Sequence, residues 1–464
     1  MQCFSIDICQ RVVLLLSFCG VSVSNYYFEK NMRILSIQTY CLFLVAILFC
    51  ACQEEPHISE DPNQGQGQQE VDPSRDPSVV AQEAALLKLL GKDAGIAFST
   101  TMQPGDTISI GLEARGALQI EGMEPSQYPS RYPDKKEWTC YTITDTAVVV
   151  KGDVRTLKLL KMPIKAIVTS QAPNLEQCAI VMSSPLSELD LSHNKQLQSI
   201  DMRHVRQLRW IALPQSPTFK MCDLSDCSSL SKIDFTGCEK IEAIDLTNTA
   251  VSQLDLTNNV ELRILYLART PCPLPSLKHL KHLEDLWIEE KGLFTLDVTD
   301  LPESLIFLNI RCNRVSGVLD LSHLKKLEMC TCNDNLITEL KLHHVPTQLW
   351  AHNNQLTQIE VLTNETPDYV KWSEELEGLP CLSLYNNRLS SEVTSRLASK
   401  LFVIEKPTFG MAIIASRASS FEKYSFSGNS FDPTTLEEIK SKGWQLWGIT
   451  TNEFGGGGMD PISY

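Results

Sequence analysis

A pattern of apolar residues recurs through the middle of the chain every 21 or 22 residues. The pattern is L-x-x-L-x-L-x-x-N, and cysteine stands for leucine in the copy formed by Leu327, Cys330, Cys332 and Asn335. Its copies begin, in steps of 21 or 22 residues, at Leu175, Leu197, Phe219, Ile241, Leu262, Leu283, Leu305 and Leu327. They continue after a shorter step at Pro346 and, after an inserted segment at 363–378, at Leu379. A segment this short cannot bury its own apolar residues, so each copy has to pack against its neighbours.

A second half-pattern, L-x-x-L-D-L-[ST], lies between these copies, for example at Leu186-Leu189-Leu191 and Val251-Leu254-Leu256. It predicts a second short extended segment in each coil. The period falls in the length window of leucine-rich repeats, and the double pattern resembles the internalin-like repeats of Bacteroidota surface proteins over residues 150–450. The predicted fold is therefore a leucine-rich-repeat solenoid over residues 154–389, a right-handed coil of the α/β type that is rich in β-strand.

Both ends of such a solenoid need a cover. Residues 77–153 are predicted to form an N-terminal helix, from Asp76-Pro77 to Gly91, followed by a β cap with strands at 107–112 and 147–150.

Residues 390–453 are predicted to form a C-terminal α/β cap. One helix runs from Ser391 to Leu401, and another begins at Asp432-Pro433 and ends near Lys442-Gly443. This layout resembles the C-terminal cap of the same family. Residues 454–464, with four successive glycines, are expected to be a mobile tail.

The N-terminal region carries a predicted signal peptide at 32–51, whose apolar run from Tyr40 to Ala51 is too short to span a bilayer. Ala51 followed by Cys52 resembles the lipobox of bacterial lipoproteins, which implies cleavage before Cys52 and acylation of that residue. Residues 1–31 are interpreted either as a region that is not translated, with Met32 as the true start, or as a leader extension.

Residues 52–76 are acidic and nearly free of large apolar side chains, so they are predicted to be a flexible tether. The Gln53-Glu54-Glu55 sequence is similar to the export signal of Bacteroidota lipoproteins. The resemblance implies an outer-membrane lipoprotein exposed at the cell surface.

The net charge of −15, with 56 acidic and 41 basic residues, argues against nucleic acid as a partner. The same charge is repelled by anionic membrane surfaces. Membrane contact is therefore expected through the lipid anchor only.

The repeat register gives the cysteines positions. Inward positions hold Cys178, Cys222, Cys330 and Cys332, and Cys227 and Cys238 stand where asparagine otherwise ends the pattern. Buried thiols behave there as small apolar groups. A metal site at Cys330-Thr331-Cys332 and a disulfide framework are the alternatives.

No nucleophile elbow, phosphate-binding glycine loop or zinc motif is present in the sequence. The histidine pairs, His279 with His282 and His343 with His344, are expected on solvated loops. The recurrent aspartates at 190, 234, 255, 297 and 320 are interpreted as loop-bonding residues, with a glycosidase pair or a Ca²⁺ site as alternatives. No catalytic residue, metal or cofactor is predicted, and the protein is not expected to be an enzyme.

Outward strand positions vary from coil to coil, and the later coils place large aromatic residues there. These positions are expected to form a patch roughly 20 Å long on the concave sheet. The predicted ligand-binding residues are Tyr266, Trp287, Phe307, Asn309, Arg311, Trp350, His352 and Tyr385. The alternative is that a cap or the 363–378 insertion covers them.

The sequence thus predicts a non-enzymatic surface adhesin or receptor for a protein or glycan on host or neighbouring cells. Two other classes stay open: a structural subunit or spacer of a cell-envelope complex, and a hydrolase located in one of the caps. The oligomeric state and the ligand's identity do not follow from the sequence.

Overall fold

The computed structural model describes residues 75–130, 138–367, 380–404, 410–417, 424–425, 428–451 and 457–461. The described residues form two compact units that meet in the chain between Asn313 and Arg314. We call them the N-terminal unit, which ends at Asn313, and the C-terminal unit, which begins at Arg314. The predicted leader, signal peptide, Cys52 and nearly all of the tether lie outside the described residues.

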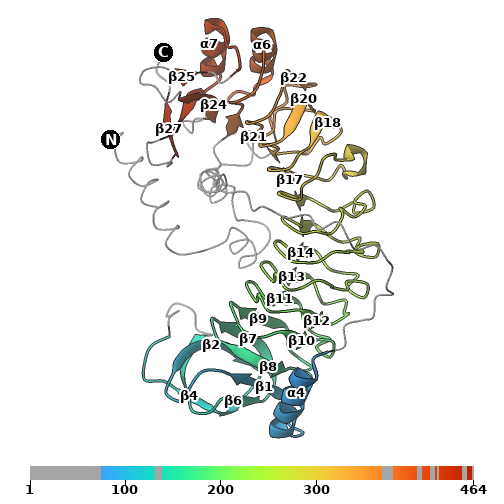
Figure 1. Cartoon of the computed structure of the whole chain (residues 1–464), viewed down its shortest axis with the longest axis vertical. Coiled ribbons are helices and arrows are strands. Elements are labelled where there is room, and N and C mark those ends of the chain that lie inside the picture. Colours follow the sequence, from blue (N-terminus) through green and yellow to red (C-terminus); the bar gives the residue numbers. More distant parts are fainter. Residues whose placement is uncertain are drawn as a thin grey trace, which may run out of the picture. The chain divides into compact units, whose positions relative to one another are not determined.

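The N-terminal unit opens with α4 (Pro77–Leu90). Asp76 caps the helix by accepting a hydrogen bond from the Ser78 amide at 2.8 Å, and Gly91 ends it with a φ of 70°. The helix packs on β1 (Gly95–Thr100) and β8 (Ile164–Val168), where Leu86 and Leu90 are buried (Figure 1). These are the helix limits expected from the sequence.

Antiparallel strands follow α4 and lead into the repeats. One sheet has the order β3 (Gln119–Glu121), β6 (Ala147–Lys151), β1, β8. In the other, β2 (Thr107–Ala114) pairs antiparallel with β5 (Trp138–Ile143) and β7 (Val154–Leu160), and β4 (Met123–Pro125) pairs with β5. β7 then pairs in parallel with β9 (Gln177–Val181), so the cap covers the first edge of the repeat sheet.

The repeats of the N-terminal unit stack as a parallel ladder in the register expected from the sequence (Figure 1). After β9 its strands are β11 (Ser199–Asp201), β13 (Met221–Asp223), β14 (Ala243–Asp245), β15 (Ile264–Tyr266), β16 (Asp285–Trp287) and β17 (Phe307–Asn309). The central residue of each strand points inward; Ile244, Leu265 and Leu286 are fully buried. Their burial against neighbouring coils holds the ladder together.

The second half-pattern forms strands only in part. β10 (Glu188–Asp190) pairs in parallel with β12 (Trp210–Ala212), whereas the half-pattern residues at 230–235 and 251–256 form no strand. A short 3₁₀ turn, η1 (Val298–Asp300), follows the half-pattern at 293–298. Leu230 and Leu256 are nevertheless buried. Apolar spacing specifies which side chains face inward, but it does not specify where the backbone finds its hydrogen bonds.

The C-terminal unit contains two parallel sheets. One consists of β18 (Ser316–Leu321), β20 (Leu336–Leu342) and β22 (Gln358–Val361). The other contains β19 (Met329–Thr331), β21 (Gln348–Trp350), β23 (Cys381–Ser383), β24 (Gly410–Arg417) and β26 (Trp444–Thr451). Here both half-patterns of a coil are strands.

Two helices complete this unit. α6 (Ser391–Lys400) is capped by Ser390 and packs on β22, and α7 (Pro433–Ser441) is capped by Asp432 and packs on β26. Both helices lie within a residue or two of their predicted limits. β25 (Tyr424–Ser425) pairs antiparallel with β24. Part of the segment expected to be a mobile tail forms β27 (Gly457–Pro461), which pairs antiparallel with β26. In the part of the chain that the structure describes, no helix has the length and apolar character to cross a membrane.

Candidate ligand-binding face

The recurrent aspartates have the loop-bonding role expected from the sequence. Asp255 Oδ1 accepts hydrogen bonds from the amide and hydroxyl of Thr257 at 2.9 and 2.6 Å. The same contact from the amide two residues later is made at Asp190, Asp234, Asp297 and Asp320. These carboxylates therefore hold turns in place, which accounts for their regular recurrence.

The ninth position of the repeat ties successive coils together. Asn313 Nδ2 donates to the carbonyls of Ile288 and Ile310, both at 2.9 Å, and Asn313 Oδ1 accepts from the Lys291 amide at 3.0 Å. Asparagines 335, 354 and 387 make similar backbone contacts. Cys227 takes this position in another coil and donates its thiol to the Met202 carbonyl at 3.1 Å, as its place in the pattern indicates.

Lys291 occupies the same ninth position, which the sequence analysis did not single out. Its Nζ donates to the carbonyls of Thr270 and Cys272 at 2.6 and 2.9 Å. Burial lowers the pKa of Lys291. Its ammonium thus replaces the asparagine amide as a donor between coils.

A column of left-handed residues precedes the ninth position. In the N-terminal unit it comprises Met182, His204, Asp226, Asn248, Arg269, Glu290 and Cys312, with φ between 51° and 61°. Side chains of this column pair between coils: His204 Nδ1 lies 2.9 Å from Asp226 Oδ2, and Asn248 Nδ2 donates to Asp226 Oδ1 at 2.6 Å. Left-handed backbone is unfavourable for most of these residue types, so surrounding contacts hold it. The column is visible in the sequence only after the repeat register has been assigned.

Tyr266 and Trp287 lie side by side on β15 and β16, with ring centroids 4.8 Å apart. Only 3% of the Tyr266 surface is exposed, and its hydroxyl donates to Asp285 Oδ2 at 2.7 Å. Burial raises the pKa of Asp285 to about 7. Trp287 on β16 and Phe307 on the adjacent strand β17 are partly exposed. Tyr266 is therefore a buried support, and of these three aromatic side chains Trp287 and Phe307 reach the surface.

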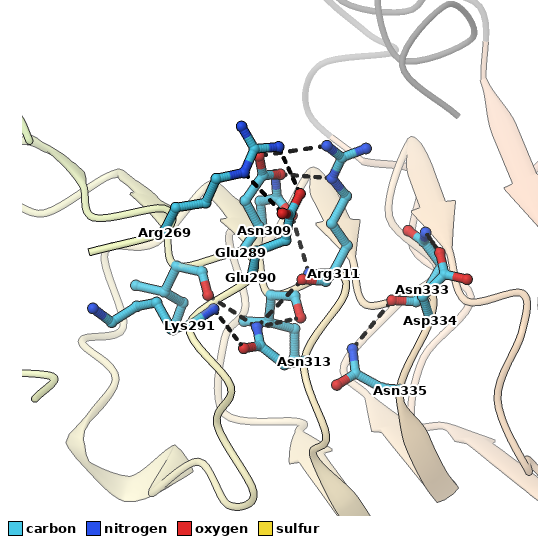
Figure 2. A network of polar contacts seen from close by, with 12 residues as sticks. Arg269, Glu289, Glu290, Lys291, Asn309, Arg311, Asn313, Asn333, Asp334 and Asn335 are labelled. Atoms are coloured by element: carbon cyan, nitrogen blue, oxygen red, sulfur yellow. Dashed lines mark hydrogen bonds and ion pairs between the residues drawn. The ribbon is translucent and has the colours of Figure 1, made fainter. Parts of the chain in front are cut away.

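Asn309 and Arg311 form a buried polar network with Glu289 (Figure 2). Arg311 Nε and Asn309 Nδ2 donate to Glu289 Oε2 at 2.6 and 2.7 Å. Arg311 is only 4% exposed. Beside this network, Arg269 pairs with both carboxylate oxygens of Glu290 at 2.8 and 2.7 Å. We expected Arg311 to be available for orienting a ligand; the structure instead pairs it internally, since a buried guanidinium requires a counter-charge.

In the C-terminal unit, the predicted residues Trp350, His352 and Tyr385 are buried, with 1%, 0% and 9% of their surfaces exposed. The His352 and Tyr385 rings stack with centroids 4.4 Å apart, and the Trp350 ring meets His352 edge-on at 6.1 Å. The expectation of an open patch is therefore wrong for these three residues. Most of the 363–378 insertion lies outside the described residues.

The strand face of the N-terminal unit also carries acids that the sequence analysis did not select as site residues. Asp201, Asp223 and Asp245 stand in register on β11, β13 and β14. Arg203 Nε donates to Asp201 Oδ1 at 2.7 Å and lies 3.4 Å from Asp223 Oδ2. A signal was present in the sequence, because the three aspartates occupy one column of the repeat.

The inward cysteines lie where the register places them, and Cys178, Cys222, Cys330 and Cys332 are all buried. Burial raises the pKa of Cys178 to about 12 and that of Cys222 well above its usual value. Both therefore remain thiols at neutral pH. Among the described ranges, no group of three or more His, Cys, Asp and Glu side chains is placed to hold a metal ion.

No protein-family model and no curated protein matches the chain. Among solved structures, an internalin (inlF) from Listeria monocytogenes str. 4b F2365 is 16% identical over 64% of this chain and 87% of its own, with a TM-score of 0.38. The functional domain of InlJ from Listeria monocytogenes is 15% identical over 60% of this chain and 78% of its own, with a TM-score of 0.25. The Arabidopsis receptor kinase HAESA, in complex with the peptide hormone IDA and the co-receptor SERK1, is 17% identical over 65% of this chain and 58% of its own, with a TM-score of 0.32. Similarities of this size say nothing about the ligand. The parallel ladder and the coil-joining ninth position make the chain a leucine-rich-repeat solenoid.

Proposed function

We propose that this protein is a non-enzymatic binding protein that holds a protein or glycan ligand on the strand face of its N-terminal unit. The observation that carries the proposal is the position of Trp287 and Phe307. They are partly exposed aromatic side chains at outward positions of the adjacent strands β16 and β17. Aromatic residues of this kind are common anchors in protein interfaces, and their ring faces also suit sugars.

Ring contacts and hydrogen bonds hold the residues on both sides of Trp287 in place. Tyr266 lies against Trp287 and is fixed by its hydrogen bond to Asp285. On the other side, Asn309 is held by Glu289, which also pairs with Arg311. Side chains that are ordered before binding lose less conformational entropy when a ligand arrives. The buried members of the predicted site thus support the exposed anchors instead of touching the ligand.

We further propose that the protein acts as an adhesin or receptor on the outer face of an outer membrane, anchored by acylated Cys52. The support is the resemblance of Ala51-Cys52 to a lipobox and the acidic residues that follow it. A repeat sheet presented at the end of a tether would face ligands on host or neighbouring cells.

The aromatic anchors are tested with the variant Trp287→Ala/Phe307→Ala in the full chain. Binding to cells and to a glycan array should weaken by tenfold or more, since a truncated anchor costs about 2 kcal/mol of binding energy. The melting temperature should fall much less than after truncation of a fully buried aromatic residue, because both side chains are partly exposed.

Phe294→Ala is the matched control, because Phe294 is 63% exposed and lies outside the strand ladder. It should leave binding unchanged. The proposed site would be overturned if the double variant bound as well as wild type. It would also be overturned if Phe294→Ala lost as much binding as the double variant. Self-association of the wild type that disappears in the double variant would instead support the structural-subunit class.

A further inference from the structure

A row of three carboxyl groups crosses adjacent strands of the N-terminal unit. Asp201 pairs in register with Asp223, and Asp223 pairs in register with Asp245. Neighbouring strands are about 4.8 Å apart, and residues in register point to the same side of the sheet. Each carboxyl group therefore faces the next one along the row.

Among the residues that the structure describes, Arg203 is the one cation in contact with this row. Arg203 contacts both oxygens of Asp201, at 2.7 and 2.5 Å, and its Nε lies 3.4 Å from Asp223 Oδ2. No other cation among the described residues contacts Asp223 or Asp245. Three ionised carboxylates beside one guanidinium would leave two negative charges without compensation.

Asp223 and Asp245 are also almost completely buried, with 0% and 1% of their surfaces exposed. Asp245 Oδ1 accepts a hydrogen bond from the Thr247 amide at 2.8 Å. Its other oxygen is buried and has no hydrogen-bond partner in the described part of the chain. A buried carboxylate oxygen in this position is costly when ionised, whereas protonation removes the charge.

Among the described residues, the other groups that surround Asp223 and Asp245 bring no further positive charge into contact with these two carboxyl groups. On the β14 side, Tyr266 directs its hydroxyl to Asp285. Asp226, in the turn after β13, is another acid and is paired with His204. The inward neighbour of Asp223 on the same strand is the buried thiol of Cys222.

Burial raises the pKa of Asp223 well above its usual value, and the neighbouring carboxylates of Asp245 and Asp201 raise it further. Burial also raises the pKa of Asp245, to about 6. Two adjacent buried carboxyl groups cannot both ionise easily, so they titrate as a pair.

We propose that Asp223 and Asp245 share a proton at mildly acidic pH, and that its release as the pH rises toward neutrality destabilises the N-terminal unit. This inference goes beyond the proposed binding function and does not depend on it, because it concerns the stability of the strands that carry the binding face. The pair forms a pH-sensitive element within the repeat ladder.

The direction of the effect follows from the raised pKa values. A group with a higher pKa in the folded state stabilises the fold fully at low pH, and this contribution is lost as the pH rises through the folded-state pKa. For Asp245 the loss falls between about pH 4 and pH 7, given a pKa of about 6 against 3.8. Over that range, the deprotonation of Asp245 raises the equilibrium constant for unfolding on the order of 100-fold.

The test compares thermal melts of the full-length wild type and Asp245→Asn between pH 5 and pH 8. Asparagine can accept the Thr247 hydrogen bond and carries no charge. We expect the variant to gain stability relative to wild type as the pH rises, by several degrees in melting temperature at pH 8. Asp223→Asn should also gain melting temperature relative to wild type as the pH rises. It provides the test if Asp245→Asn fails to fold.

Asp255→Asn is the matched control. Asp255 also accepts from a threonine two residues later, but it is solvent-exposed, and hydrogen bonds from Thr257 lower its pKa. Its difference from wild type should stay constant between pH 5 and pH 8.

The proposal would be overturned if the difference in melting temperature between wild type and both Asp245→Asn and Asp223→Asn stayed constant from pH 5 to pH 8. It would also be overturned if Asp255→Asn gained stability with rising pH as these two variants do. Infrared difference spectra give a direct readout. The wild type should show a protonated carboxyl band at pH 5 that declines toward pH 8 and is reduced in Asp245→Asn, and its absence at pH 5 would also contradict the shared proton.

Discussion

Trp287 and Trp350 occupy the same position of the repeat but differ in their surroundings. Trp287 is partly exposed, whereas Trp350 is 1% exposed. Both are outward in the repeat register, so the register alone predicts equal accessibility. What separates them is the packing around each strand, which depends on residues distant in the sequence.

The burial of Trp350 leads to a prediction about stability. Trp350→Ala should lower the free energy of unfolding by about 3–5 kcal/mol, because it removes a large, fully packed side chain. Urea unfolding measures the change. Trp350→Phe should lower the free energy of unfolding by clearly less. Phenylalanine keeps most of the packing, and the buried Trp350 Nε1 has no hydrogen-bond partner among the described residues, so the substitution breaks no hydrogen bond there. A Trp350→Ala protein with wild-type stability and reduced ligand binding would show that Trp350 is a surface anchor after all.

At the scale of elements, local signals were sufficient wherever a helix is delimited by its own neighbours. Asp76 with Pro77 and Gly91 marks α4, and Ser390 and Asp432 mark the starts of α6 and α7. The second strand of each coil was less predictable. Several of its apolar residues, such as Leu230 and Leu256, are buried as expected, whereas Ile233 and Leu254 are only half-buried. Backbone pairing is present in β10 and β12 and absent at 230–235 and 251–256.

The C-terminal helices give a prediction at this scale. Truncation after Ser390 removes α6, which packs on β22, and β24, which pairs with β23. The last leucines of the ladder would then be exposed to water, at a cost of roughly 25 cal/mol for each Å². We expect the truncated protein to aggregate and to melt at a lower temperature, as measured by light scattering and calorimetry. A monomeric product with an unchanged melting temperature would contradict a capping role.

At the scale of the whole molecule, attachment to a membrane rests on Cys52. We predict that the mature protein begins at Cys52 and carries acyl chains, because this cysteine follows a signal-like apolar run and a small residue. Intact mass after detergent extraction should show cleavage before Cys52 and added lipid. Cys52→Ala should lose the lipid and leave the membrane fraction, and retention at the wild-type level would refute the anchor.

The sequence by itself determined the repeat register, the inward leucines and cysteines, and the residues that cap the helices. Period, capping and turn chemistry act over a few residues, so they can be read without coordinates. Only the tertiary structure decided which outward residues remain accessible. It paired Arg311 with Glu289, placed Tyr266 beside Trp287 and buried Asp223 beside Asp245. The physical reason is that exposure and charge compensation depend on side chains from neighbouring coils, more than 20 residues away in the chain.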